Sequence, residues 1–217
     1  MKAFAKDFFV LVLCEESGRV TKAFRKRGFN AWSVDLLPTS GDLPQYHIQF
    51  DAILALQNLK EKNRMPDLII AFPPCTYLTV AGNRFAKDPE RQRKREEAAH
   101  FVYSIWERSL PCPIAIENPV GWLNTHWKRP HQIINPYQFG DPFAKRTCLW
   151  LRDLPPLVPT NVLERPPEGW ANQCFDASGR NRGFKIRDPK MRSKTFPGIA
   201  EAMAEQWGNY LLERGKI

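Results

Sequence analysis

The chain has 217 residues, 43% of them hydrophobic, and carries a formal net charge of +9. This length suits one globular domain with a small addition, and the hydrophobic content excludes a disordered or fibrous chain. The longest apolar run near the start, at 8–14, is too short to cross a bilayer, and no secretory leader is apparent. We therefore expect a cytosolic protein with no membrane partner.

Short apolar runs alternate with helical segments along most of the chain. In chain order, the pattern predicts strands at residues 8–13, 31–35, 46–50, 68–72, 114–116 and 147–151. It predicts helices at 17–28, 52–60, 88–109 and 198–214, the first capped by Ser17 and the third opened by Asp88 and Pro89. This alternation is typical of an α/β fold with a Rossmann-like parallel sheet.

Polar or reactive groups follow most of these strands. Because ligands of such sheets bind beyond the carboxyl ends of the strands, we expect the functional site to contain these groups. They are Cys14 and Glu15, then Asp35, Asp51, the run Pro73, Pro74 and Cys75, and finally Glu117 and Asn118.

The first strand leads through a turn with Gly18 into a helix, which suits a nucleotide cradle. Asp35 lies 17 positions after Gly18, near the ~20-residue spacing at which an acid meets a ribose hydroxyl. The turn is not a Gly-x-Gly-x-x-Gly motif, and it lacks the lysine of a phosphate loop. An adenosine-bearing ligand without a triphosphate therefore fits better than ATP.

The five cysteines are scattered without a Cys-x-x-Cys pair, and the four histidines form no ligand cluster. This argues against a disulfide framework and against a metal site. One cysteine is unusual because Pro73 and Pro74 rigidly aim Cys75 over the sheet edge. Adjacent parallel strands lie roughly 5 Å apart, so Cys75 and Glu117 can reach one small ligand.

A thiolate and a carboxyl that converge on one pocket indicate covalent catalysis with acid assistance. The alternative for Cys75 is a buried structural cysteine. The alternative for Glu117 is a salt bridge or a helix cap.

Two segments resemble the catalytic motifs of the DNA cytosine-5 methyltransferases, in that family's order: FPPCTYLTVAG at 72–82 and IENP at 116–119. The resemblance extends to the turn at 14–18, to Asp35 and Asp51 and to KRTCLWL at 145–151, and it is greatest to the short members carried by bacteriophages. It implies a Rossmann-like class I methyltransferase sheet with a small C-terminal addition. It also implies S-adenosylmethionine as cofactor, S-adenosylhomocysteine as product and DNA as partner, in the host cytoplasm if the chain is phage-encoded.

The resemblance divides the chain into a catalytic core at 1–151, a small proline-rich and basic target-contact region at 152–192, and a C-terminal helix at 193–217 that returns to the core. In the implied reaction, Cys75 attacks C6 of cytosine, Glu117 donates to or protonates N3, and C5 takes the methyl group. Lys145 stands where the family usually has an arginine at the base. A duplex substrate would require the base to be flipped out of the stack.

The resemblance also implies which residues bind. The implied cofactor-binding residues are Cys14, Glu15, Ser17, Gly18, Asp35, Leu36, Asp51, Phe72 and Pro73. The implied substrate-binding residues are Pro74, Thr79, Asn118, Arg146, Thr147, Arg180, Arg182 and Lys185.

The positive charge is concentrated in one segment, 179–194, which holds seven basic residues and one acid. Such an arm suits contact with phosphates, and a merely solvated loop is the alternative. About forty residues separate Leu151 from the closing segment, which leaves little chain for reading base edges. We therefore predict short or relaxed sequence specificity, or a substrate other than long duplex DNA.

Three functions remain open from the sequence. The first is methylation of cytosine in DNA, and the second is the same chemistry on RNA or on a free cytosine nucleotide. The third is a nucleic-acid-binding protein with a degenerate methyltransferase fold. The basic arm favours a polymer over a mononucleotide, and the presence of both Cys75 and Glu117 speaks against the third.

Overall fold

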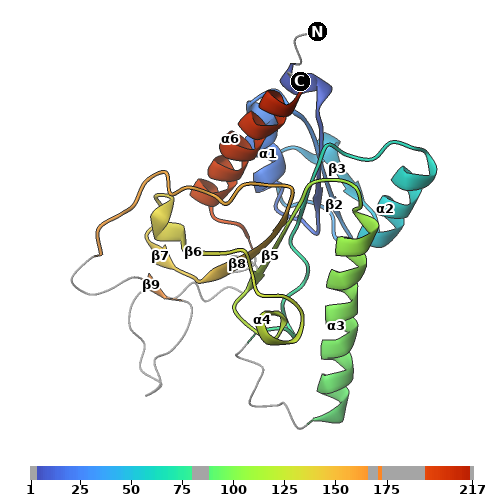
Figure 1. Ribbon diagram of the computed structural model, residues 1–217, viewed down its shortest axis with the longest axis vertical. Coiled ribbons are helices and arrows are strands. Elements are labelled where there is room, and N and C mark those ends of the chain that lie inside the picture. The colour runs from blue at the N-terminus through green and yellow to red at the C-terminus, as the bar shows by residue number, and fades with distance from the viewer. Residues whose placement is uncertain (1–3, 80–87, 166–170, 173–193, 216–217) are drawn as a thin grey trace.

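The computed structural model describes residues 4–79, 88–165, 171–172 and 194–215. Its centre is a seven-stranded sheet (Figure 1). In spatial order, the strands are β3 (His47–Gln49), β2 (Asn30–Asp35), β1 (Phe9–Leu13), β4 (Leu68–Ala71), β5 (Ile114–Pro119), β8 (Thr147–Arg152) and β6 (Gln132–Ile134). The first five strands in this order, β3, β2, β1, β4 and β5, run parallel to one another. Strand β8 is antiparallel to both of its neighbours, β5 and β6. This mostly parallel order confirms the predicted Rossmann-like α/β sheet.

Helices cover both faces of the sheet (Figure 1). Those on one face are α1 (Arg19–Lys26) and α6 (Pro197–Arg214), and those on the other are α2 (Ala52–Glu61) and α3 (Pro89–Arg108). Alternate residues of β1 serve the two cores: Val10 and Val12 pack towards α1 and α6, and Leu11 and Leu13 towards α2 and α3. Burial on both sides explains why the strands are continuous apolar runs.

The expected Ser17 cap of α1 is wrong. The N-cap residue is Gly18, in the left-handed conformation with φ 63°, and it makes no side-chain cap. Instead, the Glu15 carboxylate accepts hydrogen bonds from the backbone nitrogens of Val20 and Thr21. Because Gly18 turns the chain sharply, Glu15 rather than Ser17 lies over the helix end.

The predicted start of α3 is confirmed, since the Asp88 side chain accepts from the Glu90 nitrogen at 3.0 Å and Pro89 is the first helical residue. Strand β5 runs three residues beyond its predicted end at Ile116, because that part pairs with the antiparallel β8. The sequence pattern missed several short elements. They are α4 (Leu123–His126), strand β6, the small parallel pair of β7 (Phe143–Ala144) and β9 (Ala171–Asn172), and the 3₁₀ turns Ala5–Asp7, Pro44–Tyr46 and Pro136–Gln138.

The closing helix α6 packs along α1, as Figure 1 shows. It buries Ile199, Met203 and Trp207, and the Trp207 ring nitrogen donates to the Pro155 oxygen at 2.9 Å. Of the predicted target-contact region, the structure describes only 152–165 and 171–172. Most of the basic arm, with Arg180, Arg182 and Lys185, therefore lies outside the described residues, and the three-part division of the chain stays a prediction.

Candidate active site

Four neighbouring strands deliver the predicted residues to one edge of the sheet. The register partners in these strands are Val34, Leu13, Ala71 and Ile116. The residues that follow them are Asp35, Cys14, Phe72 and Glu117. The predicted cofactor and catalytic residues thus meet at the carboxyl edge, where parallel sheets bind ligands.

Asn118 ties the end of β5 to the proline turn after β4. Its side-chain nitrogen Nδ2 donates to the Pro73 oxygen at 2.9 Å, and the residue is only 1% exposed. On the other side of β4, the Phe72 nitrogen donates to the Leu13 oxygen at 3.0 Å. The proline turn is therefore held from both neighbouring strands. Because the Asn118 side-chain nitrogen is bonded within the protein, the predicted contact between Asn118 and the substrate stays a prediction.

Cys75 begins a tight turn that is fastened to the chain after β5. The nitrogens of Leu78 and Thr79 donate to the Cys75 oxygen at 2.9 and 3.2 Å, and the Trp122 nitrogen donates to the Leu78 oxygen at 2.7 Å. Thr79 also forms an antiparallel bridge with Gly121. These contacts place the half-buried Cys75 next to the strand that carries Glu117.

The carboxyl of Glu117 has a raised pKa. Burial raises the pKa of its carboxyl, and the Lys145 charge and a hydrogen bond with Thr147 oppose that shift. Thr147 Oγ1 also donates to the Lys145 oxygen at 3.2 Å, and Thr147 is the register partner of Pro119. The antiparallel strand β8 thus begins beside Glu117. A carboxyl with a raised pKa holds its proton closer to neutral pH, which suits general acid catalysis.

The opposite end of the edge gathers acids around Cys14. Burial, together with the charges of Asp35 and Asp51, raises the pKa of the Cys14 thiol to about 12. Cys14 itself has a positive φ of 57°, which is uncommon outside glycine. The Asp35 carboxylate accepts from the Leu37 nitrogen at 2.9 Å, and Asp51 caps α2 through the Ile53 nitrogen. A cationic ligand would meet this acidic end favourably.

Glu15 is buried at the start of α1, where three donors meet its carboxylate. They are the backbone nitrogens of Val20 and Thr21 and the Thr21 hydroxyl, which lies 2.6 Å from Oε2. Burial outweighs these bonds and raises the pKa of Glu15 to about 7. An acidic group therefore already occupies the helix end that would otherwise favour a phosphate. This agrees with the predicted ligand, which has no triphosphate.

The other predicted residues lie around this edge with different exposure. Leu36 is 66% exposed directly after Asp35. Pro74 and Arg146 are exposed, whereas Ser17 and Thr79 are half-buried. The structure thus places the described candidates at or near one edge, and their ligand contacts stay predictions.

Two features near Cys75 were not predicted from the sequence. The first is Arg95 of α3, which donates from Nε to the Tyr77 oxygen at 3.1 Å. The signal was the spacing of Arg91, Arg95 and Ala99, which puts two arginines in line with a buried alanine. The second is Gly121, and the signal for it was its position two residues beyond the IENP segment.

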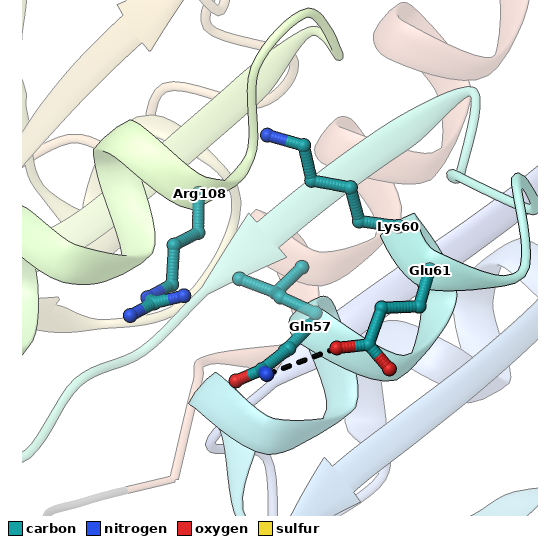
Figure 2. Close-up of a pocket in the computed structure, with 5 residues that line it drawn as sticks. Gln57, Lys60, Glu61 and Arg108 are labelled. Atoms are coloured by element: carbon teal, nitrogen blue, oxygen red, sulfur yellow. Dashed lines mark hydrogen bonds between the residues drawn. The ribbon is translucent and has the colours of Figure 1, made fainter.

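A cavity of about 330 Å³ lies away from this edge. Figure 2 shows its lining at the end of α2, where Gln57 Nε2 donates to Glu61 at 3.0 Å, with Lys60 nearby and Arg108 at the end of α3. Both helices run away from the carboxyl edge, so their final turns lie at the opposite edge from Cys75. We therefore assign the candidate site from residue geometry rather than from cavity size.

No helix among the described residues is long and apolar enough to cross a membrane. Within the same part of the chain, no group of three or more His, Cys, Asp or Glu side chains could hold a metal ion.

No protein-family model matches the sequence, and no curated protein matches it either. Solved structures do match, among them a crystal structure of a mutant of DNMT2 from Spodoptera frugiperda, with 17% sequence identity and a TM-score of 0.42. The match covers 82% of this chain and 57% of the DNMT2 chain. The present chain therefore spans a little over half the length of that protein. A likeness of this size transfers neither an activity nor a substrate.

Proposed function

We propose that this chain is an S-adenosylmethionine-dependent methyltransferase that acts at C5 of cytosine in DNA. The observation that carries the proposal is the hydrogen bond from Asn118 to Pro73, which holds the turn of Cys75 beside the strand end of Glu117. A soft nucleophile and a carboxyl with a raised pKa at one sheet edge are the pair that addition to a pyrimidine ring needs.

In the proposed reaction, the Cys75 thiolate forms a bond to C6 of cytosine, and the displaced electrons reach N3. Glu117 gives its proton to N3, so the ring becomes an enamine with a nucleophilic C5. Bound S-adenosylmethionine would supply the electrophilic methyl group that C5 takes, with S-adenosylhomocysteine as the other product. Loss of the C5 proton to solvent then expels the Cys75 thiolate, and the N3 proton returns to Glu117. Lys145, whose charge acts on Glu117, is the proposed contact to the base oxygen O2.

The acidic end of the edge fits the proposed cofactor. S-adenosylmethionine carries a positive sulfonium and no phosphate, and Asp35 and Asp51 both act electrostatically on Cys14 at this end. Asp35 is the proposed ribose partner, and Asp51 the proposed adenine contact. Glu15 supports the site indirectly, because its carboxylate is bonded to α1 and shapes the turn at Gly18.

The charge distribution favours a nucleic acid as substrate. The net charge is +9, and most of the excess lies in the predicted arm at 179–194. A single nucleotide needs few positive charges, whereas a polymer releases counterions from each neutralised phosphate. We place DNA first because of the resemblance of the Cys75 and Glu117 segments, and RNA and dCMP are included in the test.

The test uses tritium-methyl S-adenosylmethionine with duplex DNA, single-stranded DNA, RNA and dCMP, followed by nucleoside analysis. Wild type is compared with Cys75→Ala. Tritiated 5-methylcytosine in DNA that disappears in the variant supports the proposal. Label in RNA or dCMP alone overturns the choice of substrate and keeps the chemistry. DNA binding without label in any substrate overturns the enzymatic function.

A further inference from the structure

The carbonyl oxygens of the Cys75 turn all point to identifiable donors. The Cys75 oxygen accepts from the nitrogens of Leu78 and Thr79, which close the turn on itself. The Leu78 oxygen accepts from the Trp122 nitrogen at 2.7 Å, which ties the turn to the chain after β5. The two remaining oxygens, of Thr76 and Tyr77, accept from side chains.

Both of these side-chain donors are arginines of α3. Arg95 Nε donates to the Tyr77 oxygen at 3.1 Å, and Arg91 Nη2 reaches the Thr76 oxygen at 3.5 Å. The Arg91 guanidinium also lies 5.3 Å from the centre of the Tyr77 ring. The Arg95 contact is the better hydrogen bond, because its distance lies within the normal range for N–H···O bonds. Two side chains of helix α3 thus hold the turn that begins with Cys75 through hydrogen bonds to its backbone.

Arg95 is unusual for a charged residue. It is 9% exposed, and its Nη2 is buried with no hydrogen-bond partner among the residues that the structure describes. In the same described part of the chain, no carboxylate lies within ion-pair distance of it. Two acids of α3, Glu90 and Glu97, pair instead with Arg93, and Glu90 also pairs with Lys94.

A buried charge without an ion pair destabilises the folded state. The interaction that Arg95 does make is with the turn two residues beyond Cys75, and it comes from a rigid element. Arg95 lies on the same face of α3 as Ala99, and with exposures of 9% and 1% both residues are enclosed by the protein. We therefore interpret the buried position of Arg95 as one that holds the backbone of the Cys75 turn in place.

We propose that Arg95 is a positioning residue that fixes the turn of Cys75 for attack, with Arg91 as a weaker second anchor. This inference rests on the proposed function for its catalytic consequence. The anchoring itself does not, because it concerns the backbone of residues 75–79. Holding a nucleophile in an attacking geometry accounts for a large part of rate enhancement in enzymes, and a rigid supporting element is what maintains it.

The test compares the full-length wild type with Arg95→Met and Arg95→Lys. The matched control is Arg93→Met, because Arg93 lies on the same helix but its side chain is 61% exposed and paired with Glu90 and Glu97. The first measurement is amide hydrogen exchange of the segment 75–79, which needs no substrate. The second is the separate determination of kcat and KM for methyl transfer to the substrate that the wild type accepts.

We expect Arg95→Met to speed exchange at the amides of Leu78 and Thr79 by about tenfold or more, and to lower kcat by about 10–100-fold with little change in the KM for S-adenosylmethionine. Arg95→Lys keeps the charge and the stem, so it is expected to restore part of kcat. Arg93→Met is expected to behave as the wild type in both measurements. If Arg95→Met fails to fold, Arg95→Lys carries the test, because it cannot reproduce donation from Nε and must still speed exchange.

The inference is overturned if exchange at 75–79 is unchanged in the Arg95 variants, or if Arg93→Met lowers kcat as much as Arg95→Met does. A wild type that methylates no substrate overturns the proposed function, and the exchange measurement then still decides whether Arg95 anchors the turn. The two failures are therefore distinguishable.

Discussion

Gly121 is the point at which the chain after β5 touches the Cys75 turn, and it provides the sharpest test of the site. A Cβ added at this position would lie 2.0 Å from the Leu78 oxygen and 3.0 Å from the Thr79 Cα. Both are backbone atoms, so no side-chain rotation relieves the overlap. Since ordinary contact begins near 3.4 Å, Gly121→Ala must push the two backbones apart by more than about 1 Å.

The size of the effect follows from this displacement. Overpacking of this kind typically destabilises a fold by about 1–3 kcal/mol. A catalytic group misplaced by about 1 Å can lose about 10²-fold in rate. We therefore expect kcat for cytosine methylation to fall about 100-fold in Gly121→Ala. The KM for S-adenosylmethionine should change little, because the proposed cofactor end lies around Cys14 and Asp35.

The assay measures kcat and KM with tritium-methyl S-adenosylmethionine, together with urea unfolding of each variant. Gly208→Ala is the matched control, because its added Cβ would lie 2.7 Å from Cε2 of the Phe29 ring, between α6 and the start of β2. That variant is expected to lose stability and to keep its kcat at a temperature where it is folded. An unchanged kcat in Gly121→Ala, or an equal loss of kcat in Gly208→Ala, would refute this reasoning. The contact between Gly121 and the backbone of Leu78 and Thr79 would then not align Cys75 with Glu117.

Three further predictions concern protons and charge. Glu117→Gln is expected to lower kcat about 10²–10⁴-fold. In a pH–rate profile, only the wild type should lose activity as the pH rises through the raised pKa of Glu117, because the carboxyl then gives up its proton; a retained kcat excludes it as the acid. Burial raises the pKa of Glu15 from 4.5 to about 7, so between those pH values the folded chain keeps a proton that the unfolded chain releases. The unfolding free energy should therefore fall by up to about 3 kcal/mol as the pH rises across that window, and urea unfolding should show a flatter profile in Glu15→Gln. Replacing Arg180, Arg182 and Lys185 together by Gln should reduce the slope of log affinity for DNA against log salt by about 2–3 in fluorescence anisotropy; an unchanged slope would mean that the arm makes no phosphate contacts.

Much of the architecture could be predicted from local patterns alone. The central strands are short apolar runs because both of their faces are covered by helices, and this leaves a direct mark on the sequence. Helix α3 could be located from Asp88 and Pro89, since a cap and an N1 proline act over one turn. The candidate edge could be inferred as well. In a parallel sheet, all strands end at the same side, so Cys75 and Glu117 had to come near each other once their strands were recognised.

The tertiary structure alone decided how these residues are held. The cap of α1 depends on the left-handed turn at Gly18, which selects Glu15 over Ser17. A charge-balanced stretch of α3 does not indicate which of its arginines is buried, and only the contact with Tyr77 separates Arg95 from Arg93. The raised pKa of Glu117 depends on burial by distant segments of the chain, which outweighs the opposing effects of Lys145 and Thr147. Spacing along the chain reports helical turns and strand faces, because these are fixed by neighbours in sequence. Burial, close backbone approach and hydrogen bonds between distant segments arise only when those segments pack together.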